Sequence, residues 1–521
     1  MERHCCRRHA RCADDPRGGL FSMNLTANSL RSALLAMLLL MSWAATALGG
    51  PLDGRIDRII ARTDLGGASI AIHAVEVQTG RELIAYRADQ PMIPASNMKL
   101  ITSGVALEVL GPDFAFRTEF RIDDGVTPPT LVVVGSGDPA LGDPVLLERE
   151  EVGLSVDKLF DTIAGVIAQS GARSFGEIVI DDRVFDRTFV HPSWPADQLN
   201  RWYCAEVGGL NMLRNVVTVF AEPSQPGGSP ITRMVPDAPW ISLANRARSD
   251  PKGNNTAWVS RPEPNDNMTL FGIVRTRCEI EVAIHNPPIF AGRVIAAELA
   301  RRGIDIDPQR VRMARPEEQF DGLRTLAVVT TPIADVLERV NTDSHNLYAE
   351  ALMKRVGHEV SGEPGSWENG AAVTRMIISD KLGAEHAQST TVSDGSGMSR
   401  DNRVQPATLT AWMRAIARDP ARWQVFVRSL AVPGKGTLEK RFIDRELSCE
   451  LAAKSGYLSG VYALSGVLTE PRSGRQVAFS ILLNDVPSGT RARNAKPFHE
   501  AVVEELDAWL SPQPTGANLG G

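Results

Sequence analysis

Residues 94–110 read PASNMKLITSGVALEVL, and this stretch decides how the whole chain is interpreted. Ser96 and Lys99 lie three positions apart at the head of an apolar run, so on a helix they share one face. A serine hydroxyl becomes a strong nucleophile when a neighbouring base takes its proton, and a lysine can be that base when burial lowers its pKa. The ordinary alternative is a helix-capping serine followed by a solvated lysine. Apolar residues on nearly every face of this helix predict burial, which favours the catalytic interpretation.

Two further short motifs follow along the chain. Ser344-His345-Asn346 precedes a predicted helix and, taken alone, fits a plain helix cap. Lys454-Ser455-Gly456 stands at the end of a strand-like run, where a hairpin turn with a solvated lysine is the simpler explanation. Together, S-x-x-K, S-x-N and K-[S/T]-G in this order form the signature of penicillin-recognising serine acyltransferases.

Competing catalytic motifs are missing from the sequence. Ser396 in DGSG lacks the first glycine of a G-x-S-x-G elbow, and there is no HExxH and no P-loop. Lys435-Gly436-Thr437 has the wrong residue order and no preceding strand. The cysteines beyond residue 50 are Cys204, Cys278 and Cys449, which allow at most one disulfide and form no C-x-x-C pair. We therefore expect neither a metal nor a cofactor.

The N-terminal region predicts export. Residues 33–48 (ALLAMLLLMSWAATAL) are apolar and follow Arg31, and the small residues Ala45, Ala47 and Gly49 offer cleavage positions. This is the pattern of a secretory signal peptide, with an uncleaved anchor as the alternative. We expect residues 1–49 to be an N-terminal extension and signal peptide, and the mature protein to occupy the periplasm with at most peripheral membrane association. The net charge of −6 without a basic stripe argues against nucleic-acid partners.

The order of elements suggests that the two ends of the chain share one sheet. Strand patterns at 68–77 and 81–88 open the chain, and helices dominate from 332 to 417. Strand patterns return at 450–454, 460–469 and 475–484, before an amphipathic helix at 497–510. Between these halves, short strand-like runs alternate with Pro/Gly/Asn-rich loops. The simplest arrangement is one antiparallel sheet that joins both ends, with the middle of the chain inserted.

The chain resembles the low-molecular-mass class C penicillin-binding proteins, the exported D-alanyl-D-alanine carboxypeptidase/endopeptidases. The resemblance runs from about 67 to 507 and includes PASNMKLITSGVAL, GSGDPAL at 135–141, IVIDDRVFD at 178–186, SDGSGMSRDNRVQP at 393–406 and GTLEKRF at 436–442. The long gap between Ser96 and Ser344 is typical of this branch. The resemblance implies an α+β fold, a penicillin-binding/serine β-lactamase-like transpeptidase domain with an antiparallel sheet flanked by helices and a large, mainly β, two-part insertion.

The same resemblance implies domain boundaries. Residues 50–112 and 331–512 are expected to form a discontinuous DD-peptidase (penicillin-binding) domain. Residues 113–330 are expected to be an inserted accessory region, made of two small nested domains. Residues 513–521 are expected to be a disordered tail.

It also implies roles for the motif residues. Ser96 attacks the carbonyl of the penultimate D-alanine, and Lys99, kept neutral by burial and by a nearby lysine, takes its proton. Ser344 passes the proton to the leaving nitrogen. Asn346 binds the substrate amide and helps to fix Lys99.

Substrate binding is expected at the third motif. Lys454 and the Ser455 hydroxyl are expected to hold the terminal carboxylate of the substrate. The backbone N–H groups of Ser96 and of Tyr457, the residue that follows Gly456, are expected to form the oxyanion hole. Tyr457 replaces the small residue of the family's K-T-G-T pattern and narrows the cleft. Asp197, in PSWPADQLNRWYCAE, is a candidate for the acidic residue near the substrate side chain, with Gln198 and simple surface exposure as alternatives.

The expected function is that of a serine D-alanyl-D-alanine carboxypeptidase/endopeptidase. It would hydrolyse peptidoglycan stem peptides and cross-links through a Ser96 acyl-enzyme, and β-lactam antibiotics would acylate the same serine. The alternatives are a serine β-lactamase and a non-catalytic peptidoglycan-binding protein of the same fold.

Overall fold

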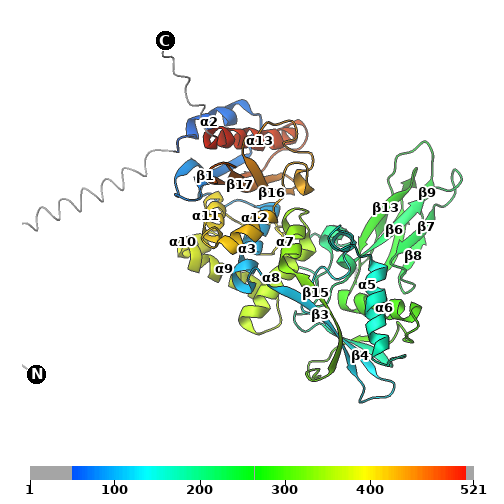
Figure 1. Ribbon diagram of the computed structural model, residues 1–521. Coiled ribbons are helices and arrows are strands. Elements are labelled where there is room, and N and C mark those ends of the chain that lie inside the picture. Colours follow the sequence, from blue (N-terminus) through cyan, green and yellow to red (C-terminus); the bar gives the residue numbers. More distant parts are fainter. Residues whose placement is uncertain (1–49, 263, 512–521) are drawn as a thin grey trace, which may run out of the picture. The chain divides into compact units, whose positions relative to one another are not determined.

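A computed structural model describes residues 50–262 and 264–511, and these form one compact unit (Figure 1). The predicted extension and signal peptide at 1–49 and the predicted tail at 513–521 lie outside the described residues. Within the described part of the chain, no helix has the length and apolar character needed to cross a bilayer.

The two ends of the chain meet in one five-stranded antiparallel sheet, as predicted. Its order is β16-β17-β18-β1-β2, and its strands are β1 (Ser69–Glu76), β2 (Glu82–Tyr86), β16 (Glu450–Leu458), β17 (Val461–Thr469) and β18 (Gln476–Asn484). Ile72 of β1 lies opposite Ile481 of β18. β18 is buried over most of its length, because both faces of the sheet are covered by helices. β16 lies at the edge of the sheet, where Ala453 N donates to the carbonyl oxygen of Ala431 at 2.8 Å.

Helices cover the two faces of this sheet. On one face, α2 (Asp53–Arg62) and α13 (Thr490–Leu510) share a core with β1 and β18 that includes Ile56, Val502 and Phe479. The other face packs against a group of helices (Figure 1). They are α3 (Met98–Leu110), α7 (Ile333–Asn341), α8 (Asn346–Ser361), α9 (Trp367–Leu382), α10 (Ala384–Gln388), α11 (Pro406–Ile416) and α12 (Pro420–Arg428). Residues 98–107 of α3 are all buried, which matches the burial predicted from its apolar sequence.

A second five-stranded sheet occupies the middle of the sequence, in the order β14-β5-β4-β3-β15. Its strands are β3 (Ala115–Asp123), β4 (Thr130–Val134), β5 (Glu177–Asp181), β14 (Val311–Met313) and β15 (Arg324–Pro332), and α5 (Val156–Gln169) and α6 (Pro287–Arg301) pack beside it. The remaining strands are short: β6 (Val216–Glu222), β7 (Ile231–Val235), β8 (Ser242–Asn245), β9 (Arg248–Ser249), β10 (Trp258–Ser260), β11 (Asn267–Phe271), β12 (Ile273–Val274) and β13 (Cys278–Ala283). The structure thus has the mixed α+β fold that was expected, with a strand-rich middle segment.

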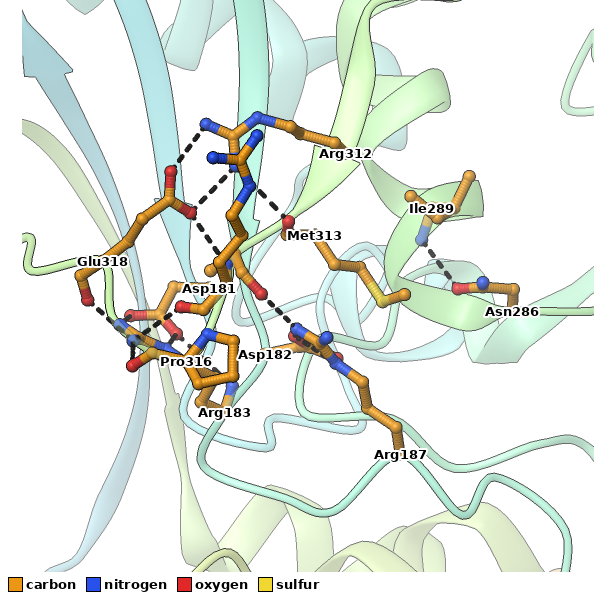
Figure 2. Close-up of polar contacts among 12 residues, drawn as sticks. Asp181, Asp182, Arg183, Arg187, Asn286, Ile289, Arg312, Met313, Pro316 and Glu318 are labelled. Carbon is orange, nitrogen blue, oxygen red and sulfur yellow. Dashed lines mark hydrogen bonds and ion pairs between the residues drawn. The ribbon is translucent and has the colours of Figure 1, made fainter.

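Charged side chains link the loops that follow β5 and β14 (Figure 2). Arg183 Nε lies 2.7 Å from Asp181 Oδ1, and its Nη1 donates to the carbonyl oxygen of Glu318 at 2.7 Å. Arg312 pairs with the Glu318 carboxylate at 2.8 Å. These contacts anchor the start of the segment after β5, which later supplies Trp194 and Tyr203 to the neighbourhood of Ser96.

Two local predictions about the C-terminal part were wrong. Lys454-Ser455-Gly456 does not end a strand at 454 but lies inside β16, which continues to Leu458. The pairing with β17, in which Lys454 lies opposite Ser465, outweighs the low strand propensity of these residues. The last helix begins at Thr490 rather than 497 and contains Pro497, which helical propensity alone disfavours.

Candidate active site

Lys99 lies at the centre of the site, on the first turn of α3. Its Nζ donates to Ser96 Oγ at 3.2 Å, to Asn346 Oδ1 at 2.7 Å and to the carbonyl oxygen of Ser396 at 2.8 Å. Ser96 belongs to a short 3-10 turn, Ala95–Asn97, that leads into α3. A charged ammonium has three donors and uses them all here. Once Lys99 loses a proton, its lone pair can face the serine hydroxyl.

The environment of Lys99 favours the neutral amine. The side chain is fully buried, and this burial lowers its pKa to about 7, although the charges of Glu350 and Asp394 act in the opposite direction. A base whose pKa lies near the working pH is well matched to proton transfer. Lys99 therefore has the properties required to activate Ser96.

Lys454 and Ser344 form a second pair beside the first. Lys454 Nζ donates to Ser344 Oγ at 2.9 Å and to the carbonyl oxygen of Ser455 at 2.8 Å. Burial and the nearby charge of Lys99 hold the pKa of Lys454 well below its usual value. Ser344 has a φ of 63°, a conformation that is rare for a residue with a side chain. The loop between α7 and α8 is therefore held in a strained shape that presents this hydroxyl.

Asn346 begins α8 and connects Lys99 to the middle segment of the chain. Its Oδ1 accepts from Lys99, and its Nδ2 donates to the carbonyl oxygen of Tyr203 at 2.8 Å. Burial and neighbouring cations lower the pKa of His345 well below its usual value, so this ring is uncharged. The contact of Oδ1 with Lys99 and the contact of Nδ2 with Tyr203 together define the orientation of the Asn346 amide.

Gly456 allows β16 to approach the backbone of Ser96. A Cβ atom at this position would lie 3.0 Å from Ser96 N and 3.0 Å from the Pro94 carbonyl oxygen. Glycine avoids this crowding, and the edge strand therefore lies against the backbone of Ser96. The neighbouring Tyr457 side chain is 64% exposed and projects away from this contact.

Loop 393–402 also belongs to the site, although none of its residues was predicted to lie there. Ser396, considered only as a nucleophile, contributes its carbonyl oxygen to Lys99. Glu350 accepts hydrogen bonds from Gly395 N and Ser396 N, each at 2.8 Å, and so holds that carbonyl in place. Glu350 and Asp394 are completely buried. The sequence SDGSGMSRDN is rich in polar residues, which indicates a polar loop but does not show that the loop contacts Lys99.

Asp197 is not brought into this cluster by any hydrogen bond or ion pair among the described residues. It is exposed, in the short turn Ala196–Gln198. The adjacent Gln198 accepts from the Tyr203 hydroxyl at 3.2 Å.

Burial, and to a smaller degree the charge of Asp197, raises the pKa of the Cys204 thiol to about 12. Cys204, Cys278 and Cys449 are all free thiols.

Comparisons with known proteins identify the family. A sequence model of the D-Ala-D-Ala carboxypeptidase 3 (S13) family matches residues 52–506. The D-alanyl-D-alanine carboxypeptidase of Actinomadura sp. (strain R39) is 29% identical over 488 residues, covering 89% of this chain and 86% of that protein. Carboxypeptidase DacB of Mycolicibacterium smegmatis is 32% identical over 471 residues, covering 88% and 83%.

The fold has a solved counterpart. The crystal structure of penicillin-binding protein 4 from Haemophilus influenzae superposes with a TM-score of 0.71 at 20% sequence identity, covering 87% of this chain and 99% of that one. This similarity confirms the penicillin-binding protein fold expected from the sequence. This chain belongs to the D-Ala-D-Ala carboxypeptidase 3 (S13) family of serine peptidases, which confirms the resemblance to the D-alanyl-D-alanine carboxypeptidase/endopeptidases found in its sequence.

Proposed function

We propose that this protein is an exported D-Ala-D-Ala carboxypeptidase that hydrolyses peptidoglycan stem peptides through an acyl-enzyme on Ser96. The observation that supports it best is the buried Lys99 amine, with a pKa of about 7, located 3.2 Å from the Ser96 hydroxyl. Family membership supports the D-Ala-D-Ala specificity. Hydrolysis of cross-links, the endopeptidase reaction, would use the same residues.

Acylation proceeds by proton transfer through the two serine–lysine pairs. Ser96 Oγ attacks the carbonyl carbon of the penultimate D-alanine while neutral Lys99 accepts the hydroxyl proton. The new C–O bond forms, the amide C–N bond breaks, and the proton reaches the leaving nitrogen through Ser344, whose Oγ lies 2.9 Å from Lys454 Nζ. Water then hydrolyses the ester and restores Ser96.

Substrate orientation is assigned to the edge strand. The Ser455 hydroxyl and Lys454 bind the terminal carboxylate, and the backbone N–H groups of Ser96 and Tyr457 stabilise the oxyanion. The close approach of Gly456 to Ser96 N supports this arrangement. Asp197 is a candidate contact for the substrate's third side chain, supported by its exposure and by its position in the chain near Tyr203.

The domain organisation and location are part of the same proposal. We assign residues 50–112 and 331–512 to the peptidase domain, residues 113–330 to an accessory insertion and residues 1–49 to a signal peptide that directs the protein to the periplasm. The pairing of β1 with β18 supports a peptidase domain built from both ends of the chain. β-Lactams are expected to acylate Ser96, and the related Haemophilus influenzae protein has been solved in complex with a β-lactam.

Labelling with fluorescent penicillin tests this proposal. The wild-type protein should form a stoichiometric adduct that is lost slowly, and Ser96→Ala should form none. Release of D-alanine from a stem pentapeptide should show the same dependence on Ser96. Absence of an adduct on the wild type, or an adduct on Ser96→Ala, would show that Ser96 is not the nucleophile, and rapid loss of the label would indicate a β-lactamase instead.

A further inference from the structure

The loop 342–345, between α7 and α8, carries Ser344 in a conformation that its own residues do not favour. Ser344 has a φ of 63°, in the left-handed region that disfavours residues with a Cβ atom. His345, the N-cap of α8, makes no side-chain capping hydrogen bond. Lys454 donates to the Ser344 hydroxyl at 2.9 Å, but this bond reaches the side chain and not the backbone. Contacts from outside the loop must therefore hold the Ser344 backbone in this shape.

Arg339 holds the residues on both sides of Ser344. It lies in the last turn of α7, and its side chain is 7% exposed. Its Nη1 donates to Asp343 Oδ2 at 2.5 Å, and its carbonyl oxygen accepts from His345 N at 3.0 Å. Because the N–H group of His345 belongs to the peptide unit that follows Ser344, these contacts restrict the backbone angles at Ser344. They therefore also restrict the direction of its hydroxyl group.

Asp143, a residue of the middle segment, holds Arg339 in turn. It is completely buried and directly precedes α4 (Pro144–Leu147). Its Oδ2 accepts from Arg339 Nε at 3.0 Å and from the hydroxyl of Tyr348 on α8 at 2.5 Å. Its Oδ1 accepts from Val145 N at 3.0 Å. A buried carboxylate needs such donors and holds them strongly, because little water competes for them. One carboxylate therefore joins the end of α7, the first turn of α8 and the middle segment.

We propose that Asp143 and Arg339 are positioning residues that hold the Ser344 hydroxyl where it relays a proton to the leaving nitrogen. The inference rests on the proposed function, which gives Ser344 this relay. In that step Ser344 gives its hydroxyl proton to the nitrogen as the amide C–N bond breaks, and it receives in exchange the proton that Lys99 took from Ser96. Asp143 and Arg339 act through the position of Ser344 and exchange no proton themselves.

Two substrates that differ in the leaving atom test this. Both carry the same acyl-D-alanyl group, which is joined to D-alanine through an amide in one and to a thiol acid of the same length through a thiolester in the other. The amide nitrogen must be protonated to leave, whereas a thiolate leaves as the anion because the pKa of a thiol is only about 8.5. A general structural defect should slow both reactions equally. A misplaced Ser344 hydroxyl should slow only the reaction of the amide.

Arg339→Lys and Asp143→Asn should each lower kcat/KM for the amide at least about tenfold and change kcat/KM for the thiolester by less than about threefold. A lysine at 339 keeps the charge, but its ammonium cannot replace the planar fork that reaches both Asp143 and Asp343. Asp143→Asn keeps the volume of the side chain and removes the charge that attracts Arg339.

Arg187→Lys is the matched control. Arg187 also pairs with a buried carboxylate, that of Asp182 at 2.7 Å, in the loop after β5. This variant should keep both kcat/KM values near those of the wild type. The final extent of penicillin labelling counts the active sites in each preparation, so that all rates are compared per active site.

Ser344→Ala removes the hydroxyl that the two residues are proposed to hold. In this background, Arg339→Lys should change the residual kcat/KM for the amide by less than about twofold. The inference would be overturned by an unchanged amide rate in Arg339→Lys, by an equal loss for both substrates, or by the same loss with and without the Ser344 hydroxyl.

The wild-type protein in the same assays tests the proposed function separately. Hydrolysis of neither substrate, together with no penicillin adduct on Ser96, would refute the proposed function and this inference with it. Hydrolysis of both substrates by the wild type, with unaltered selectivity in Arg339→Lys and Asp143→Asn, would refute this inference alone.

Discussion

Two lysines, Lys99 and Lys454, are completely buried within the same small cluster. Burying one charged amine is costly, and two neighbouring charges also repel each other. Both lysines therefore have pKa values shifted downward, and each contacts a serine hydroxyl. The cluster favours a state in which a proton moves readily between amines and hydroxyls.

The pH dependence of acylation follows from Lys99. Only the neutral amine accepts the Ser96 proton, so the acylation rate constant should rise as pH increases through about 7. Burial raises the pKa of Glu350 itself to about 7, and its charged form raises the pKa of Lys99, so Glu350→Gln should move this rise to lower pH, by roughly half a pH unit. Stopped-flow acylation by a chromogenic β-lactam between pH 5 and 9 measures both profiles. An unchanged midpoint would show that Glu350 has only a structural role.

A second buried lysine offers a matched comparison. Lys354 Nζ lies 2.7 Å from Asp186 Oδ1 and 3.8 Å from the ring centroid of Trp367, away from Ser96. Lys99→Met should slow acylation by about 10²–10⁴-fold. Lys354→Met should lower the free energy of unfolding by about 2–3 kcal/mol yet leave the acylation rate of folded protein within about twofold. Urea denaturation and penicillin labelling of both variants check this, and equal acylation defects in the two would contradict the base assignment.

At the scale of elements, the loop 393–402 packs against Lys99 and against the turn that carries Ser96. Asp394 accepts from Gly397 N at 2.8 Å and from Ser399 N at 2.6 Å, and Glu350 on α8 holds Gly395 and Ser396. The loop therefore behaves as a rigid part of the site, although it contains neither helix nor strand.

Gly397 provides a test of this loop. Its φ is 80°, and a Cβ atom would lie 1.8 Å from the Ala95 carbonyl oxygen, next to Ser96. Gly397→Ala should slow acylation at least about tenfold and destabilise the fold by more than about 2 kcal/mol. Gly383→Ala is the control, because Gly383 has a φ of 100° with nothing within 4 Å of the added atom. Gly383→Ala should lower the free energy of unfolding by only about 1–2 kcal/mol and preserve the acylation rate. A similar loss of acylation rate in both variants would show that the contact with Ala95 is not the cause.

At the scale of the whole molecule, the middle segment contributes directly to the site. Tyr203 supplies a carbonyl oxygen to Asn346, and Trp194 Nε1 donates to Asp394 Oδ2 at 3.0 Å. Trp194 is also part of the core that contains α3 and α8. The middle segment therefore helps to hold loop 393–402 in place.

Removal of the Trp194–Asp394 hydrogen bond should lower both the stability of the fold and the acylation rate. Trp194→Phe keeps most of the packing but removes a hydrogen bond to a buried carboxylate, so the free energy of unfolding should fall by about 1.5–3 kcal/mol. Acylation should slow as well, because Asp394 orders the loop that faces Lys99. Trp258→Phe, at a side chain that is 42% exposed, should change stability by less than about 0.5 kcal/mol. Urea unfolding curves give the free energies of unfolding, and penicillin labelling gives the acylation rates. A wild-type acylation rate in Trp194→Phe would show that this contact of the middle segment does not affect acylation.

Much of this protein could be predicted from local patterns. The apolar run after Lys99 indicated a buried helix, and the strand patterns at both ends indicated the shared sheet, because side-chain periodicity and burial are properties of short segments. The extension of β16 through Lys454-Ser455-Gly456 could not be predicted in this way, since it depends on pairing with β17.

The sequence by itself determined the family, the order of the three motifs and the identity of the serine and lysine residues they contain. Only the tertiary structure decided which groups meet Lys99: the Ser396 carbonyl, held by Glu350, and Asn346, held by Tyr203. It also decided that Asp143 meets Arg339 and Tyr348. These contacts join residues far apart in the chain, and their distances depend on how sheets and helices pack, which no local pattern encodes.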